Sequence, residues 1–269
     1  MVHFGLTSIL LCFIATGGPE EKVNAQNAMK PRARTNYLMD RLTDAVNFEG
    51  FNDPRTTLQD GLDYLADRFD LSFDVDEKAF AKAFGKKNAR SAANEPIATT
   101  PIPPMRNVAL ERVSEKILDR LDVSSGATFL IGRGQILITT RAAASKEILG
   151  DSSLPLPRLI HRRMEKRQLR DALDEIAEHS DATVVLDESV GEKAKETISA
   201  RFLNATPESA VRIIADRYDL TLVHLDNVLY VTSREKAAKL REDMEKGKKN
   251  PPKQMPPADE PVNKHGDKE

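Results

Sequence analysis

The spacing of apolar residues changes from helical to strand-like between residues 58 and 75. From Leu58 to Phe69, apolar residues recur every three or four positions, which is typical of an amphipathic helix. From Leu71 to Val75 they alternate with polar residues, which is the period of a half-buried strand. Thr56 precedes the helical stretch and is its expected N-cap. A helix followed by a strand is therefore predicted here.

The same two kinds of spacing return farther along the chain. Leu110–Leu121 predicts a second amphipathic helix. Residues 128–131 and 136–139 are rich in β-formers and flank Gly132-Arg133-Gly134, which predicts a β-hairpin. Residues 46–51 supply an upstream strand, so this part of the chain alternates helices with short strands.

The whole pattern occurs twice. The sequence TLQDGLDYLA at 57–66 returns 111 positions later as QLRDALDEIA at 168–177. The remaining predicted elements follow in the same order: strands at 159–164, 182–186 and 198–202, a helix opened by Pro207 behind Thr206, and a hairpin of 221–225 and 228–232. The predicted fold is α+β, with two tandem small units of order β-α-β-β-α-β-β.

These copies predict the domain organisation. The units span 36–150 and 158–240, and the linker 151–157 contains two prolines. The first unit carries an insertion at 82–104, and a long insertion of this kind is either functional or disordered. Residues 247–269 contain five prolines and hardly any apolar residues, which predicts a disordered tail.

The order of elements, together with Leu169-Arg170-Asp171-Ala172-Leu173 leading into residues 182–186 and the closing hairpin, resembles the short N-terminal (STN) domain of secretins and TonB-dependent receptors. The resemblance covers about 75 residues of the second copy. It implies a periplasmic module that docks other proteins. The chain departs from the family at Pro101-Ile102-Pro103-Pro104-Met105, where a strand must lie at a sheet edge or begin late.

After Thr232 the sequence contains neither a segment resembling the pore of a secretin nor a TonB box, so only the docking role is expected. The partner would be one or more envelope proteins, and the resemblance leaves their identity and the oligomeric state open. Strand addition by a partner would use the hairpins. The expected docking residues are Phe129, Ile131, Ile136, Ile138, Leu222, His224, Leu229 and Val231.

The main alternative to protein docking is binding to an anionic polymer or surface, which depends on charge. With 40 basic and 42 acidic residues, the chain has no overall charge that favours an anionic partner. One segment is locally basic, through Arg158, Arg162, Arg163, Lys166, Arg167 and Arg170. It could bind an anionic envelope polymer or surface, or it could be a solvated strand whose charges prevent aggregation. Because no aromatic residues are interleaved, nucleic acid is not an expected partner.

The N-terminus predicts export. The apolar run Phe4–Ala15 is too short to span a membrane as a helix but suits the core of a signal peptide, and cleavage is expected after Ala25. The alternatives are an apolar tail or a retained anchor. Cys12 lies within this run, so the mature periplasmic protein would contain no thiol and no membrane span.

The sequence offers little for catalysis. Paired carboxylates for acid–base catalysis could come from Asp60, Asp63, Asp76 and Glu77. Each of them has a counterpart in the other copy, however, and a residue that serves the fold recurs with the fold. No two histidines have metal-ligand spacing, and no phosphate loop, dinucleotide motif or nucleophile elbow occurs. We therefore expect no enzyme activity, cofactor or metal, and an enzyme is the weakest alternative.

Overall fold

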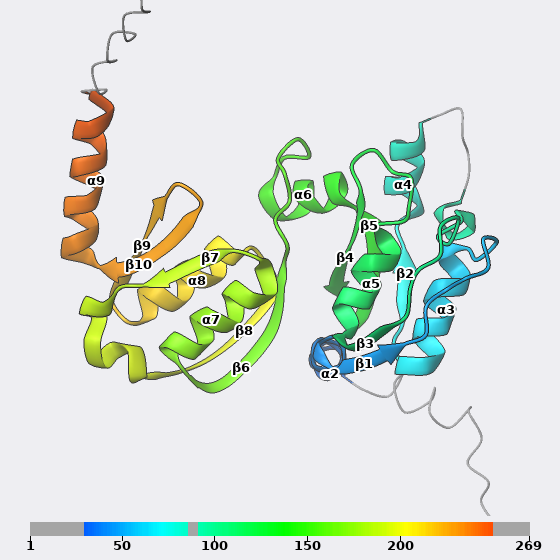
Figure 1. The fold of residues 1–269 in the computed structure, drawn as a ribbon, viewed down its shortest axis with the longest axis horizontal. Coiled ribbons are helices and arrows are strands. Elements are labelled where there is room, and N and C mark those ends of the chain that lie inside the picture. Colours follow the sequence, from blue (N-terminus) through cyan, green and yellow to red (C-terminus); the bar gives the residue numbers. More distant parts are fainter. Residues whose placement is uncertain (1–29, 86–90, 250–269) are drawn as a thin grey trace, which may run out of the picture. The chain divides into compact units, whose positions relative to one another are not determined.

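The computed structural model describes residues 30–85 and 91–249. The predicted signal peptide, Cys12, residues 86–90 of the insertion and the tail from residue 250 lie outside the described residues. The structure is α+β, with helices packed beside small sheets (Figure 1).

The first half contains the predicted order of strands and helices together with further helices. They are α2 (Pro31–Thr43), β1 (Ala45–Phe48), α3 (Leu58–Phe69), β2 (Phe73–Val75), α4 (Glu77–Phe84), the 3-10 helix η1 (Ala92–Asn94), β3 (Met105–Ala109), α5 (Leu110–Leu118), β4 (Ala127–Gly132), β5 (Gln135–Thr140) and α6 (Arg141–Leu149). Strand β3 begins directly after the prolines at 101–104, which cannot donate to a strand ladder.

The second half follows with a similar alternation. Its elements are β6 (Ile160–Gln168), α7 (Leu169–Ser180), β7 (Thr183–Leu186), the 3-10 helix η2 (Glu188–Lys195), β8 (Thr197–Ala205), α8 (Pro207–Arg217), β9 (Leu220–Leu225), β10 (Val228–Ser233) and α9 (Arg234–Lys249). Helix α9 therefore includes the first three residues of the predicted tail.

The strands of the described residues form four small sheets, in the orders β1-β3, β2-β5-β4, β6-β8 and β7-β10-β9. In each three-stranded sheet the central strand pairs in parallel with the earlier strand and antiparallel with its hairpin neighbour. Strands β2 and β7 are therefore edge strands, as are β4 and β9.

Local chemistry explains where these elements begin and turn. The N-cap of α3 is Thr57, and the prediction of Thr56 is wrong by one residue. The Thr57 hydroxyl accepts from the backbone of Asp60, whose carboxylate accepts from the backbone of Thr57, so the two form a capping box. Both hairpins turn through residues with positive φ, Arg133 and Gly134 in the first and Asp226 in the second.

The chain divides into two compact units. Unit 1 contains the described residues up to Lys166 together with Ser199–Pro207, and unit 2 contains Arg167–Ile198 together with the described residues from Glu208 onward. Most of β6 and β8 therefore belongs to unit 1. The predicted boundaries of 36–150 and 158–240 stay a prediction.

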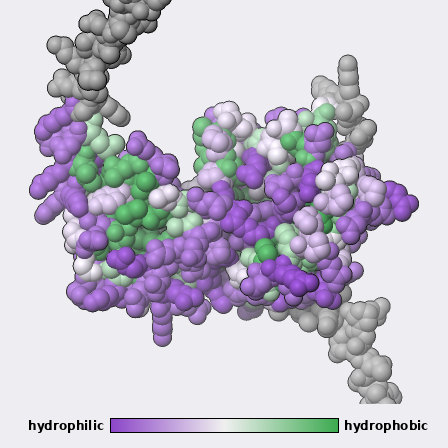
Figure 2. All heavy atoms as spheres, viewed as in Figure 1, coloured by the Kyte–Doolittle hydropathy of each residue, from purple (hydrophilic) through white to green (hydrophobic). Residues whose placement is uncertain are grey.

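Each unit has its own apolar core. In unit 1, helix α3 packs against α5, and both share one core with the hairpin β4–β5, with Leu58, Leu65, Ile117, Ile136 and Ile138 fully enclosed. In unit 2, buried side chains from α7, α8 and β10 form the interior, including Ile176, Val211, Ile214 and Val231. On the face shown in Figure 2, hydrophobic side chains also gather at the surface around β9 and β10.

Helices α2 and α4 were not predicted. Helix α2 buries Leu38, Met39 and Leu42 in the core of unit 1. The described part of the insertion is also packed, since Ile97 and Ile102 are fully buried. It is tied to the start of α3 by hydrogen bonds from the Leu58 amide to the Glu95 carbonyl (2.8 Å) and from the Ile97 amide to the Thr56 carbonyl (2.9 Å).

Gly50 allows this insertion to approach β1 closely. Its φ is +82°, and an added Cβ would lie 2.3 Å from the Ile102 carbonyl oxygen. Gly50→Ala should therefore lower the free energy of unfolding by roughly 2 kcal/mol or more in urea denaturation. Gly150→Ala is the control, because Gly150 has a φ of +81° but open space around it. Equal losses in the two variants would contradict the close approach.

No helix among residues 30–85 and 91–249 is both long and apolar enough to cross a membrane.

Candidate functional site

Within residues 30–85 and 91–249, strand β2 pairs with β5 on one side only, so no described strand covers its other edge. The Ile136 amide donates to the Ser72 carbonyl (2.9 Å) and the Asp76 amide donates to the Ile138 carbonyl (2.8 Å), so the even-numbered residues here bond to β5. The backbone groups of Phe73 and Val75 therefore point to the opposite, free edge.

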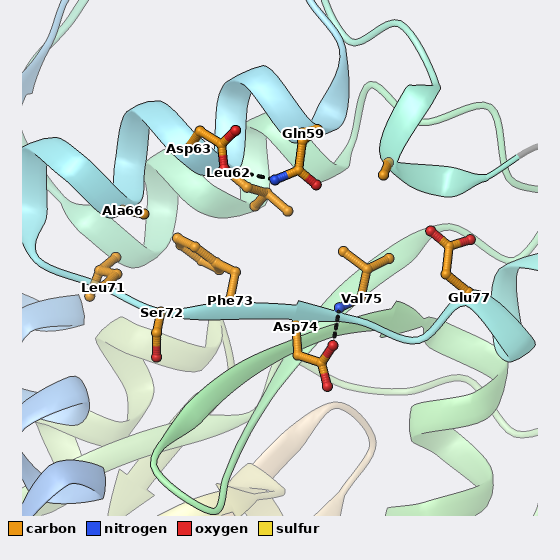
Figure 3. Close-up of a pocket in the computed structure, with 11 residues that line it drawn as sticks. Gln59, Leu62, Asp63, Ala66, Leu71, Ser72, Phe73, Asp74, Val75 and Glu77 are labelled. Carbon is orange, nitrogen blue, oxygen red and sulfur yellow. Dashed lines mark hydrogen bonds between the residues drawn. The ribbon is translucent and has the colours of Figure 1, made fainter. Parts of the chain in front are cut away.

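A groove of about 470 Å³ lies between this edge and helix α3 (Figure 3). Leu62 and Ala66 approach from α3, while Phe73 and Val75 point from the strand toward the helix. The groove is therefore apolar along its floor, with main-chain donors and acceptors along one side. That combination suits an added strand, which needs backbone partners and pockets for alternate side chains.

Among the described residues that line the groove, the charged side chains are acidic: Asp63, Asp74 and Glu77. Asp63 accepts a hydrogen bond from Gln59 (Nε2 to Oδ1, 2.7 Å) within α3. A basic side chain also reaches the lining, since Arg34 donates to the Ser72 hydroxyl (2.8 Å). Asp63 and Asp74 are exposed, so their charges face solvent at the groove.

Asp74 also covers part of the free edge. Its carboxylate accepts from the Val75 amide (3.0 Å), which is one of the outward-pointing backbone donors (Figure 3). A charge beside an open strand edge discourages pairing with unrelated strands. An added strand would have to replace this hydrogen bond in order to use the Val75 donor.

The insertion borders one end of the groove. The Glu77 carboxylate accepts from the Ser91 hydroxyl (2.7 Å) and from the Ala92 amide (3.1 Å). These bonds hold η1 beside the groove, and Ala93 of η1 lines it. Part of the groove is therefore built by the predicted insertion at 82–104.

Strand β7 of unit 2 is also an edge strand, but its chemistry differs. Counting 111 positions onward, Val185 stands where β2 has Asp74, and Arg170 stands where α3 has Gln59. Val185 is 41% exposed. The edge of β7 therefore has no carboxylate where Asp74 stands on β2. The two edges can be compared within one chain.

The hairpin side chains predicted for docking lie mostly in the interior. Phe129, Ile131, Ile136 and Ile138 are buried in unit 1, and Leu222, Leu229 and Val231 are buried in unit 2. His224 is exposed and lies 3.3 Å from Glu208.

Side chains also occupy the outer edges of both hairpins. Asn204 uses its side-chain amide to bond the Ile131 amide and the Ile131 carbonyl, both at 2.9 Å, at the outer edge of β4. Arg241 donates to the Leu222 carbonyl (3.1 Å) on β9. An incoming strand at either place would have to displace these contacts.

Four of the six basic residues of the segment 158–170 pair with carboxylates of the protein. Arg158 donates to both carboxylate oxygens of Glu115. Arg162 is buried and pairs with Glu111 (3.1 Å). The remaining members are exposed, with Arg163 beside Asp40 (3.0 Å) and Arg167 beside Glu175 (3.9 Å), while Lys166 and Arg170 lie at the surface.

His161 lies inside this same region. Its ring stacks on Phe129 with 5.2 Å between centroids, and its Nδ1 accepts from the Asn204 amide (3.3 Å). Burial lowers the pKa of His161 to about 4, despite the opposing effect of Glu111, and Arg162 adds to the lowering. The imidazole is therefore neutral at physiological pH and serves as a hydrogen-bond acceptor.

Two of the carboxylates that recur in the sequence, Asp76 and Asp187, hold local structure. Asp76 accepts from the Ala79 amide and the Thr139 hydroxyl, and so joins the start of α4 to β5. Asp187, its counterpart, accepts from Ser189, Thr232 and Lys236. Burial alone would raise the pKa of Asp187, but these hydrogen bonds hold it far below its ordinary value.

Within the part of the chain that the structure describes, no group of three or more His, Cys, Asp or Glu side chains is placed to hold a metal ion. Searches against models of known protein families and against curated protein sequences found no match.

Proposed function

We propose that this protein is an exported, non-enzymatic docking module of the cell envelope that binds a partner by strand addition at the free edge of β2. The resemblance of its sequence to STN domains supports the docking role, and the matching strand pairing of the two three-stranded sheets supports tandem copies of one unit. The signal-peptide pattern at residues 1–25 supports a periplasmic location.

One observation carries the choice of site. The backbone groups of Phe73 and Val75 point away from the sheet beside an open groove, whereas the outer edges of β4 and β9 are contacted by Asn204 and Arg241. Strand addition takes its affinity from such open main-chain groups. The alternative, an anionic polymer bound by residues 158–170, has less support because Arg158 and Arg162 already pair with carboxylates.

The test uses proline to close the edge. The Val75 amide is not part of the ladder to β5, so Val75→Pro should keep the sheet while removing an outward donor and crowding the edge. The probe is an end-capped nonapeptide that alternates valine with serine. In the wild-type protein, this peptide should slow hydrogen exchange at the Phe73 amide, as followed by NMR, and Val75→Pro should lose binding by tenfold or more.

Leu186→Pro is the matched control, because Leu186 occupies the same register on β7. It should leave the slowed exchange at Phe73 unchanged. The amide spectrum of each variant shows whether its fold is retained. Absence of any peptide effect at Phe73 in the wild-type protein, or an equal loss in both proline variants, would contradict docking at β2.

A further inference from the structure

We infer that the segment docked on β2 is an extended peptide in which lysine or arginine alternates with apolar residues. This inference rests on the proposed function and adds the chemistry of the partner. Its basis is the combination of an apolar floor with three acidic side chains around a single open strand edge.

The acids are placed to meet both faces of an added strand. Asp63 projects from helix α3, on the side toward which Phe73 and Val75 point, while Asp74 leaves β2 on the opposite side (Figure 3). Side chains of an added strand alternate between those two sides. Basic residues on either side would therefore find a carboxylate, and apolar residues on the helix side would contact Leu62 and Ala66.

Asp74 selects between neutral and basic peptides through its hydrogen bond to the Val75 amide as well as through its charge. In the free protein its carboxylate occupies the Val75 amide, so a neutral peptide must displace that bond and leave the carboxylate without its partner. A basic peptide can pair with the Asp74 carboxylate while its own backbone takes the Val75 donor. The same residue thus disfavours neutral strands and favours basic ones.

The alignment of the two repeats indicates that this selectivity belongs to unit 1. Val185 replaces Asp74 on β7, so the Leu186 amide has no carboxylate from the preceding residue. Both carboxylate oxygens of Glu77 accept hydrogen bonds, from Ser91 and Ala92, whereas Asp63 accepts from Gln59 and Asp74 from Val75 through Oδ1. Asp63 and Asp74 are therefore the acids that a ligand would engage most readily.

The experiment compares two peptides on three proteins. The peptides are the valine–serine nonapeptide and one of equal length in which lysine replaces serine, and binding is measured by fluorescence anisotropy at 20 mM and 500 mM NaCl. On the wild-type protein at low salt, the lysine peptide should bind about fivefold to tenfold more tightly, since each exposed ion pair adds a modest gain. High salt should remove most of that preference.

Two substitutions separate the charge of Asp74 from its hydrogen bond. Asp74→Asn keeps an acceptor for the Val75 amide but loses the charge, so the lysine peptide should weaken about threefold and the serine peptide should not change. Asp74→Ala frees the amide as well, so the serine peptide should tighten about fivefold. The preference for lysine should then nearly disappear.

Several results would overturn the inference. If both peptides slow exchange at Phe73 but bind wild type equally, docking stands and the basic partner is wrong. If neither peptide acts at Phe73, the proposed function itself fails. If sedimentation shows a dimer that the lysine peptide cannot dissociate, a second copy of this chain occupies the edge. If Asp74→Ala leaves the lysine preference intact, Asp74 does not set it.

Discussion

Replacing Glu111 by alanine should lower the free energy of unfolding by about 3–5 kcal/mol, because it leaves Arg162 buried without this carboxylate. The two side chains are 10% and 4% exposed, and the guanidinium lies 3.1 Å from Glu111 Oε1. Removing one member of a buried ion pair costs far more than the pair contributes, since the remaining charge stays out of water. Urea denaturation at pH 7 measures the effect.

Two control variants test whether the loss of stability comes from leaving a charge buried. Arg163→Ala removes a member of the exposed pair with Asp40 and should cost less than about 1 kcal/mol. The double variant Glu111→Leu, Arg162→Met should recover most of the stability lost in Glu111→Ala, because neither position of the pair then carries a charge. A loss below about 1 kcal/mol in Glu111→Ala would show that Arg162 reaches water.

Acidification should destabilise the protein through His161. Its pKa is about 4 in the folded chain, whereas an unfolded histidine has a pKa near 6.5. Between pH 4 and pH 6.5 the imidazole binds a proton only in the unfolded state. The stability that depends on a neutral His161 is therefore fully present above pH 6.5 and is lost as the pH falls toward 4. The expected loss between pH 7 and pH 4.5 is about 2–3 kcal/mol.

His161→Gln isolates this contribution. Glutamine can still accept from the Asn204 amide but does not titrate, and all other titrating groups are shared with the wild-type protein. The variant should therefore lose about 2–3 kcal/mol less than wild type over the same pH range. Equal losses in the two proteins would mean that His161 is protonated without cost.

The sequence predicts correctly those helices and hairpins whose positions depend on neighbouring residues. Helix α3 spans the helical run Leu58–Phe69, and both hairpins turn at glycine, aspartate or asparagine residues. Helix α8 begins at Pro207, as a proline with no amide donor favours. Helix α2 was missed although Leu38, Met39 and Leu42 already show helical spacing.

The candidate site could not be predicted in the same way, because it depends on which strands pair. The alternation at 71–75 predicts a strand but does not show that β2 lies at an edge. Strand β5 sits in the middle of its sheet, so the apolar residues of its hairpin are core rather than surface. The order of strands is a tertiary property, and it decides which backbone groups remain open.

The basic segment illustrates the same limit of a local pattern. Six basic residues within thirteen positions predict a charged surface. Their partners, however, come from distant elements: Glu111 and Glu115 lie on α5, and Asp40 lies on α2. Only the folded chain shows that Arg158 and Arg162 pair with a half-buried and a buried carboxylate, respectively.

The most direct test of docking at β2 is the set of intermolecular nuclear Overhauser effects between the valine–lysine peptide and the isotope-labelled protein. We predict contacts from the peptide backbone to the amides of Phe73 and Val75, and from its valines to Leu62 and Ala66 on α3. Contacts confined to the hairpins, or to Arg163 and Lys166 of the basic segment, would contradict the account.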